Sequence, residues 1–252
     1  MRHMLTIALA LLFCISLTAS LAPAADQPKL KALLITGDDV GSHKWKETSV
    51  ATKDILVGSG RFDVTIVEGL AVLDNQDDLA KYDVIFFHMY NAKKAPISDA
   101  GKENLLSFVK GGKGFVVAHL ASASFPKWQE WGKLCGRYWI MGKGKSGHGP
   151  RAPFQAKIAD KDHPITKGLT DFQQDDELYA RLFGDVKIQV LVTADSDWSK
   201  KTEPLAFIQE VGKGRVFHTA FGHDVKALAT PEVKTLTARG TEWAATAKVT
   251  VK

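Results

Sequence analysis

The N-terminal half of the chain alternates between continuous apolar runs and amphipathic segments. The apolar runs span residues 29–36, 62–67, 83–87 and 114–118. Short runs of this kind are typical of strands that are buried on both faces of a parallel sheet. Segments 45–57 and 99–109 carry apolar residues at helical spacing, and Ser98 can cap the second of them. The alternation predicts an α/β fold with a doubly wound, mostly parallel sheet and helices on both faces.

The C-terminal half has a different pattern. Residues 136–153 are rich in Gly and Lys and show no periodicity. A loop this long in a compact domain is usually functional or disordered. Further strand candidates lie at 154–158, 189–193, 204–209 and 214–220. Thr230 and Pro231 predict the N-cap and first position of a last helix, which ends near Trp243. We therefore expect added strands in the C-terminal half of a single domain that spans residues 26–252.

The N-terminal segment has the pattern of an export signal. Arg2 and His3 precede an apolar run over residues 4–17, and small residues follow as far as Ala25. This order predicts a signal peptide over residues 1–25 and an exported, periplasmic or extracellular protein. The run is too short to span a bilayer comfortably, so no membrane association is expected after cleavage. An uncleaved N-terminal anchor is the alternative interpretation.

Composition and short motifs exclude several function classes. The formal net charge of +5 is spread along the chain without a basic block, so a nucleic-acid partner is not expected. The sequence contains no glycine-rich dinucleotide fingerprint and no P-loop, so no nucleotide cofactor is expected. Cys135 is the one cysteine left after signal cleavage and lies near the end of a predicted helix. This position favours a small buried residue over a nucleophile.

Histidines follow several of the predicted strands. His43 comes after the first strand, His88 and His119 directly follow the third and fourth, and His223 follows the last. Ligands of open α/β sheets bind beyond the carboxyl ends of the strands, so we expect these imidazoles at one edge of the sheet. His148 lies in the long loop, which can fold over that edge. For each histidine taken alone, a hydrogen-bonded structural role is the alternative.

Imidazole and carboxylate groups together suggest metal binding or proton transfer. The candidate metal ligands are His43, His119 and His223, and the metal is a divalent ion such as zinc. The candidate catalytic residues are His119, Glu177, Asp176 and His148, with either carboxylate as a general base or a further ligand. The candidate substrate-binding residues are Asp38, Trp45, His88 and Tyr179. No H-E-x-x-H spacing is present, so the metal hypothesis rests on fold geometry, and residues 175–177 could instead form a solvated turn.

Four ordered motifs carry a family resemblance. They are residues 34–37 with His43 and Trp45, residues 111–119, residues 162–169 followed by 176–179, and residues 212–224 followed by Trp243. Together they resemble the ThuA-like (trehalose utilisation) family over roughly residues 31–245. The resemblance implies a class I glutamine amidotransferase-like, or flavodoxin-like, fold and work on sugars or keto sugars.

The sequence departs from the amidotransferase relatives at one important position. Those relatives place a cysteine nucleophile at the turn after a central strand, whereas His119 occupies that place here. Glutaminase chemistry is therefore not expected. Two hypotheses follow: a sugar isomerase, lyase or hydrolase that uses the histidines, or a non-catalytic module that binds a carbohydrate or a partner. Trp45, Trp128 and Trp139 are candidates for stacking on a small-molecule or oligosaccharide ligand, and packing in the core or at its rim is the alternative role for them. A homo-oligomer is compatible with either hypothesis.

Overall fold

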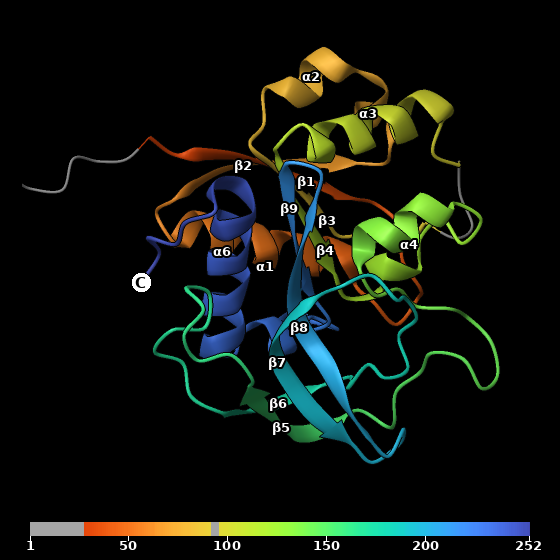
Figure 1. Ribbon diagram of the computed structural model, residues 1–252, viewed down its shortest axis with the longest axis vertical. Helices are drawn as coiled ribbons and strands as arrows, with labels where there is room; N and C mark the ends of the chain where they lie inside the picture. The colour runs from red at the N-terminus through yellow and green to blue at the C-terminus, as the bar shows by residue number, and fades with distance from the viewer. Residues whose placement is uncertain (1–27, 92–95) are drawn as a thin grey trace, which may run out of the picture.

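The computed structural model describes residues 28–91 and 96–252, and in them one mixed sheet of nine strands is flanked by helices (Figure 1). The strands are β1 (Leu30–Thr36), β2 (Phe62–Glu68), β3 (Val84–Phe87), β4 (Gly114–Ala118), β5 (Ala152–Ile158), β6 (Phe172–Asp176), β7 (Gln189–Ser196), β8 (Lys201–Val211) and β9 (Gly214–Thr219). The helices are α1 (Trp45–Gly58), α2 (Gln76–Ala80), α3 (Asp99–Lys110), α4 (Gln129–Cys135), α5 (Val225–Leu228) and α6 (Pro231–Thr246), with 3₁₀ turns η1 (Ala71–Asp74) and η2 (His119–Ala123). The predicted signal peptide, residues 1–25, lies outside the described residues.

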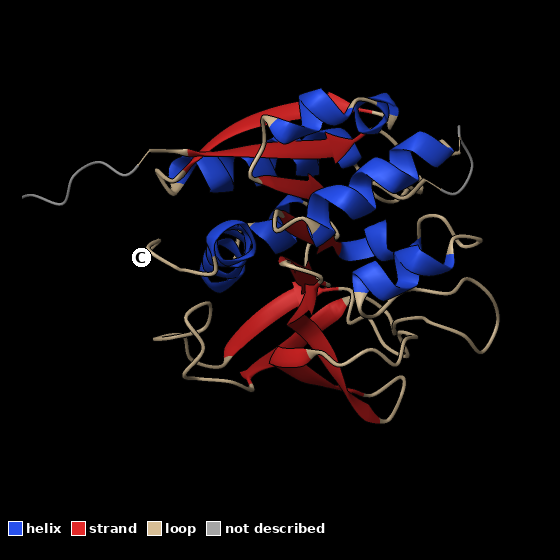
Figure 2. Cartoon of the chain, turned by 45° about the horizontal axis from the view of Figure 1, so that its top comes forward, coloured by secondary structure: helices blue, strands red, loops and turns tan. Residues whose placement is uncertain are grey.

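The strand order is β2-β1-β3-β4-β9-β8-β7-β5-β6. The first five strands in this order pair in parallel, and their arrangement is that of a flavodoxin-like sheet. The remaining strands are added to the β9 edge in antiparallel pairs. Figure 2 shows this added part of the sheet on the side of the molecule away from α2 and α3. The predicted α/β fold with added C-terminal strands is confirmed.

Helices cover both faces of the parallel part. On one face, Leu34, Phe86 and Phe217 pack with side chains of α1 and α6, such as Leu56 and Leu236. On the other face, the residues that alternate with these along the same strands pack with side chains of α3 and α4. Successive residues of a strand point to opposite faces, which is why strands buried on both sides appear as continuous apolar runs. Among the described residues, no helix is long and apolar enough to cross a bilayer.

Strand β6 is the main element that the sequence pattern did not predict. Its inward-facing positions include the buried polar residues Gln174 and Asp176, so the segment lacks the apolar alternation of a strand. It pairs with β5, and its end meets the loop after β9, where Asp176 accepts hydrogen bonds from Gly222 and His223. Residues 175–177 are therefore not a solvated turn.

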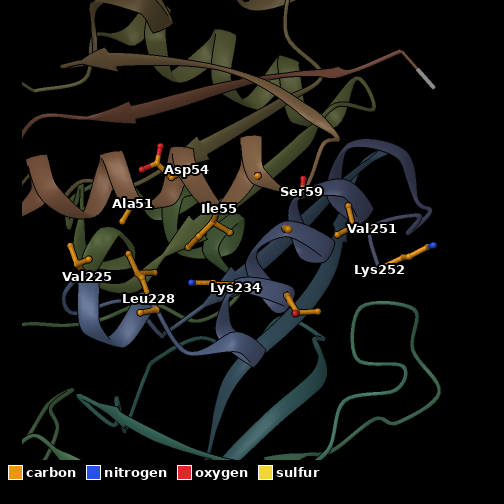
Figure 3. A pocket seen from close by; sticks show the side chains of 13 residues that line it. Ala51, Asp54, Ile55, Ser59, Val225, Leu228, Lys234, Val251 and Lys252 are labelled. Carbon is orange, nitrogen blue, oxygen red and sulfur yellow. The ribbon is translucent and has the colours of Figure 1, made fainter. Parts of the chain in front are cut away.

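A cavity of about 510 Å³ lies between α1, α5, α6 and the C-terminal tail (Figure 3). Ile55, Leu228 and Val251 contribute its apolar wall, and Lys234 contributes a charged group. None of the candidate histidines lines this cavity. The site predicted from the strand ends therefore lies elsewhere.

Candidate metal centre

Side chains from four separate segments converge beyond the carboxyl ends of the parallel strands. They are His43 from the loop before α1, His119 from the turn after β4, Glu177 directly after β6 and His223 from the loop after β9. One ligand atom from each residue lies within 4.8 Å of those of the other three. We call these residues the His/Glu cluster. They form a group that can hold a metal ion.

The spacing within the cluster fits shared coordination better than hydrogen bonding. Oε2 of Glu177 lies 3.6 Å from Nε2 of His43 and 3.4 Å from Nε2 of His119. These distances exceed the usual hydrogen-bond range. Bonds of about 2.1 Å to a tetrahedral ion would place two ligands about 3.4 Å apart. Nε2 of His119 and Nδ1 of His223 are also buried without a hydrogen-bond partner, and a bound cation would satisfy both.

The second nitrogen of two cluster histidines is held by an acceptor. Nδ1 of His43 lies 2.8 Å from Oδ1 of Asp39, and Nδ1 of His119 lies 2.7 Å from the carbonyl oxygen of Ala220. An acceptor of this kind fixes the proton on Nδ1 and leaves the Nε2 lone pair to face the centre of the cluster. A metal ion bound at Nε2 would require the proton to stay on Nδ1, and both acceptors are placed to receive it.

His119 occupies a strained backbone position. Its φ angle is +51°, in the left-handed region that non-glycine residues rarely adopt. The residue lies where β4 turns directly into η2, and the ring of Tyr179 stacks on its imidazole with the centroids 4.2 Å apart. Strain of this kind persists where the surrounding structure holds it, and it is common at functional sites. The turn after β4 thus directs the imidazole of His119 into the cluster.

Glu177 is the carboxylate at the centre of the cluster. Its oxygens lie within 3.2 to 3.6 Å of nitrogens of His43, His119, His148 and His223. Burial alone would raise the pKa of Glu177, but the neighbouring imidazoles of His119 and His43 hold it well below the usual range. Burial likewise opposes protonation of His43, yet Asp39 and Glu177 raise its pKa to about 9. The carboxylate is therefore anionic and attracts positive charge.

Asp176 has a positioning role. Its carboxylate accepts hydrogen bonds from the backbone N–H groups of Glu177, Gly222 and His223, and its side chain is buried. Because its oxygens already accept these three hydrogen bonds, the carboxylate is poorly suited to act as the general base or further ligand that the sequence suggested. Instead, one carboxylate ties the end of β6 to the loop that carries His223, and so fixes two cluster residues relative to each other.

Arg151 ties the same segments together from the outside. Its guanidinium group contacts both carboxylate oxygens of Asp224 and also reaches Asp175. Asp224 follows His223, Asp175 lies on β6 before Glu177, and Arg151 itself ends the loop that carries His148. A bidentate arginine–carboxylate contact imposes orientation as well as attraction. The residue therefore links three segments of the site, and no sequence motif had pointed to it.

His148 lies at the open side of the cluster. Its Nε2 is 3.4 Å from Oε1 of Glu177, and its Nδ1 is 2.6 Å from the carbonyl oxygen of Gly149. The side chain is 33% exposed, compared with 4% for His119. The long loop thus folds over the sheet edge and presents one solvent-accessible imidazole. Such a group can exchange protons with a substrate and with water.

The other candidate residues have different surroundings. His88 is buried, its Nδ1 lies 3.4 Å from Oγ1 of Thr52, and burial lowers its pKa to about 4. His88 is therefore enclosed by protein, whereas the sequence suggested that it contacts a substrate. Trp45 begins α1 with the ammonium group of Lys46 5.2 Å from its ring centroid, and Asp38 lines a separate cavity of about 370 Å³. Tyr179 is buried against the cluster, where its ring packs on His119.

Cys135 is fully buried at the end of α4. Burial raises the pKa of its thiol well above the usual value, so a thiolate is disfavoured. The expected role as a small buried residue is confirmed. His163 lies in a turn away from the His/Glu cluster, and its carbonyl oxygen accepts a hydrogen bond from the N–H of Thr166.

Comparisons with known proteins identify the family of the chain. The model of the ThuA family, described as trehalose utilisation, matches residues 31–244. The chain belongs to the ThuA family. A solved ThuA-like protein from Parabacteroides merdae is 31% identical over 89% of this chain and 93% of its own, with a TM-score of 0.78. No curated protein sequence matches the chain.

More distant likenesses concern the fold alone. A ThuA-like protein from Bacteroides uniformis is 16% identical over 92% of this chain and 97% of its own, with a TM-score of 0.71. A β-galactosidase from Rahnella is 15% identical over 83% of this chain, which corresponds to 31% of the enzyme, with a TM-score of 0.55. The ThuA fold thus also resembles part of a much larger protein.

Proposed function

We propose that this ThuA protein binds a divalent metal ion, such as zinc, at the His/Glu cluster and uses the site to act on a carbohydrate. The observation that carries the proposal is the convergence of three imidazoles and one carboxylate within 4.8 Å. Neutral imidazole and carboxylate groups are the ligands that zinc and related divalent metals share. Packing alone does not require buried polar groups from four segments to meet, and such groups are costly to bury without partners.

The carbohydrate part of the proposal is supported by the family and by the chemistry of the site. The family is described by trehalose utilisation, and the sugar-directed hypothesis fits a site that combines metal ligands with nearby aromatic rings. A bound divalent ion would supply Lewis-acid polarisation of a sugar carbonyl or hydroxyl group. For a keto sugar or keto-glycoside, the expected reaction is removal of the proton beside the carbonyl group, followed by isomerisation or loss of the glycosidic substituent.

The protein groups then have separate tasks. Nε2 of His148 is accessible at the open side and can accept or return the proton. His43 and His119 have their Nδ1 atoms held by Asp39 and Ala220, so their Nε2 atoms stay directed at the centre. Glu177 either completes the ligand set or acts as the base while the three histidines hold the ion. Both roles are compatible with the same geometry, and they predict different metal content and turnover for a variant of Glu177.

The proposal is tested by metal analysis of the purified protein combined with a turnover assay. We expect about one divalent ion per chain, loss of the ion in His43→Ala and His119→Ala, and retention in His163→Ala. A panel of keto-glycosides should be turned over by the loaded wild type and not by His119→Ala. Absence of bound metal after reconstitution with zinc, manganese, iron or cobalt would refute the metal assignment. Metal and sugar binding without turnover would favour the non-catalytic binding module.

We also propose that the protein is exported, as the pattern of residues 1–25 predicts. Expression of the full chain with its N-terminal segment should place the protein outside the cytoplasm in a shortened form. Intact mass measurement should then give a chain that begins near Asp26. A full-length mass in a membrane fraction would support the uncleaved anchor.

A further inference from the structure

A larger cavity, of about 620 Å³, reaches Trp139, whose ring packs on Tyr179 next to the His/Glu cluster. We call it the aromatic cavity because much of its wall is formed by aromatic side chains. These are Tyr90, Phe125, Trp128, Trp131, Tyr138 and Trp139. They come from the segments that follow β3 and β4, from α4 and from the long loop after it. The volume falls within the range of about 300 to 1,000 Å³ that is usual for small-molecule sites.

Trp139 belongs both to the aromatic cavity and to the surroundings of the cluster. Its ring centroid lies 4.5 Å from that of Tyr179 and 6.1 Å from that of His148. Tyr179 in turn stacks on His119, and Ser122 in the cavity wall follows His119 in the same 3₁₀ turn. The ring of Trp139 therefore connects the wall of the cavity, through Tyr179, to the cluster histidine His119.

The charge of the lining indicates what the cavity can hold. Lys133 is the one basic residue among the described residues that line it, and its ammonium group is paired with Glu130 at 2.6 Å. A phosphorylated or carboxylated ligand would need unpaired cationic groups. Aromatic faces offer apolar contact to the C–H face of a sugar ring. Exposed polar groups such as Gln129 and Asp185 stand at the rim, where hydroxyl groups of a ligand would find partners.

We infer that the aromatic cavity is a subsite for the second ring of a neutral two-ring glycoside whose first ring lies at the His/Glu cluster. The inference rests on the proposed function, and it places the second ring of the glycoside against the aromatic residues that line this cavity. The ring at the cluster is the one that reacts. The ring in the aromatic cavity contributes binding energy. If the reaction is an elimination or a hydrolysis, this ring is the leaving group that is released when the glycosidic bond breaks.

The test measures binding to the metal-loaded protein by calorimetry. The probes are glucose and a panel of neutral two-ring glycosides: trehalose, sucrose, cellobiose, maltose, lactose and p-nitrophenyl glucoside. We expect at least one two-ring probe to bind about 10-fold or more tightly than glucose, and Trp128→Ala to abolish that difference. Trp128→Phe, which keeps an aromatic face, should retain most of the preference. Metal content should be unchanged in both variants.

A second substitution probes the cavity without removing a core contact. Gln129→Trp adds bulk at the exposed first residue of α4 and should weaken binding of the two-ring probe while glucose binding stays the same. Gln155→Trp makes the same change on the exposed side of β5 and should have no effect. Equal binding of glucose and every two-ring probe, or an unchanged preference in both Trp128→Ala and Gln129→Trp, overturns the inference. Loss of the metal from the wild type would instead refute the proposed function.

Discussion

Nδ1 of His43 lies 2.8 Å from Oδ1 of Asp39, and the same carboxylate oxygen accepts the backbone N–H of Val40 at 2.7 Å. The imidazole is therefore held at both ends, by Asp39 on one side and by the cluster on the other. A carboxylate behind a ligating histidine fixes its orientation and raises its basicity. We expect Asp39→Ala to weaken metal binding about 10- to 100-fold, with a smaller loss in Asp39→Asn.

Competition with a chromogenic chelator at neutral pH measures the affinity of these variants. Asp38→Ala is the control, because Asp38 is the neighbouring residue and lies outside the His/Glu cluster. Equal affinities in the wild type and in both Asp39 variants would show that the contact does not support metal binding.

Substitution of Glu177 separates its two candidate roles. If the carboxylate ligates the ion, Glu177→Gln should lower the metal content because a neutral amide is a much weaker ligand. If it acts as the base, the variant should keep its metal and lose turnover by about 100-fold or more. Metal analysis and steady-state kinetics on one preparation distinguish these outcomes. Full metal content together with wild-type turnover would exclude both roles.

His148 should matter for turnover and not for metal retention. Its side chain is 33% exposed and lies outside the group of ligand atoms that fall within 4.8 Å of one another. We expect His148→Ala to keep the ion and to lower kcat by about 100-fold. His148→Gln, which preserves a polar group but cannot accept the proton, should lose turnover to the same extent as His148→Ala. A variant that loses its metal would instead make His148 a ligand.

Two buried histidines should make stability depend on pH. Burial lowers the pKa of His218 to about 4, as it does for His88, from the ordinary value of 6.5. The unfolded chain therefore binds more protons than the folded chain between these two values, and the free energy of unfolding falls as the pH drops from about 6.5 toward 4. The contribution of His218 is at most about 3 kcal/mol.

Urea unfolding in the presence of a chelator measures this contribution without interference from the metal. His218→Asn keeps a donor for the carbonyl oxygen of Cys135 and should flatten the pH dependence over that window. An unchanged slope between pH 7 and pH 5 would contradict the assignment. The absolute stability of the variant at pH 7 is not informative, because the smaller side chain also leaves a cavity.

The elements of the parallel sheet could be predicted from the sequence because strands buried on both faces have continuous apolar runs. The run at 114–118 coincides with β4, and Pro231 begins α6 as the capping pattern indicates. The antiparallel strand β6 was missed because its buried positions hold Gln174 and Asp176. The amide nitrogen of Gln174 donates to Ala227, and Asp176 accepts from Gly222 and His223, all of which lie far away in the sequence.

The sequence by itself determined that histidines follow the strands and therefore gather near one edge of the sheet. Only the tertiary structure decided which of them face the common centre. His88 and His119 each directly follow a strand, yet His88 is enclosed beside Thr52, whereas the left-handed backbone of His119 turns its ring into the cluster. Glu177 joins them because β6 pairs with β5 and packs against the loop after β9. Chain order specifies which strands end together, but the direction of a side chain beyond a strand depends on backbone angles and on partners from distant segments.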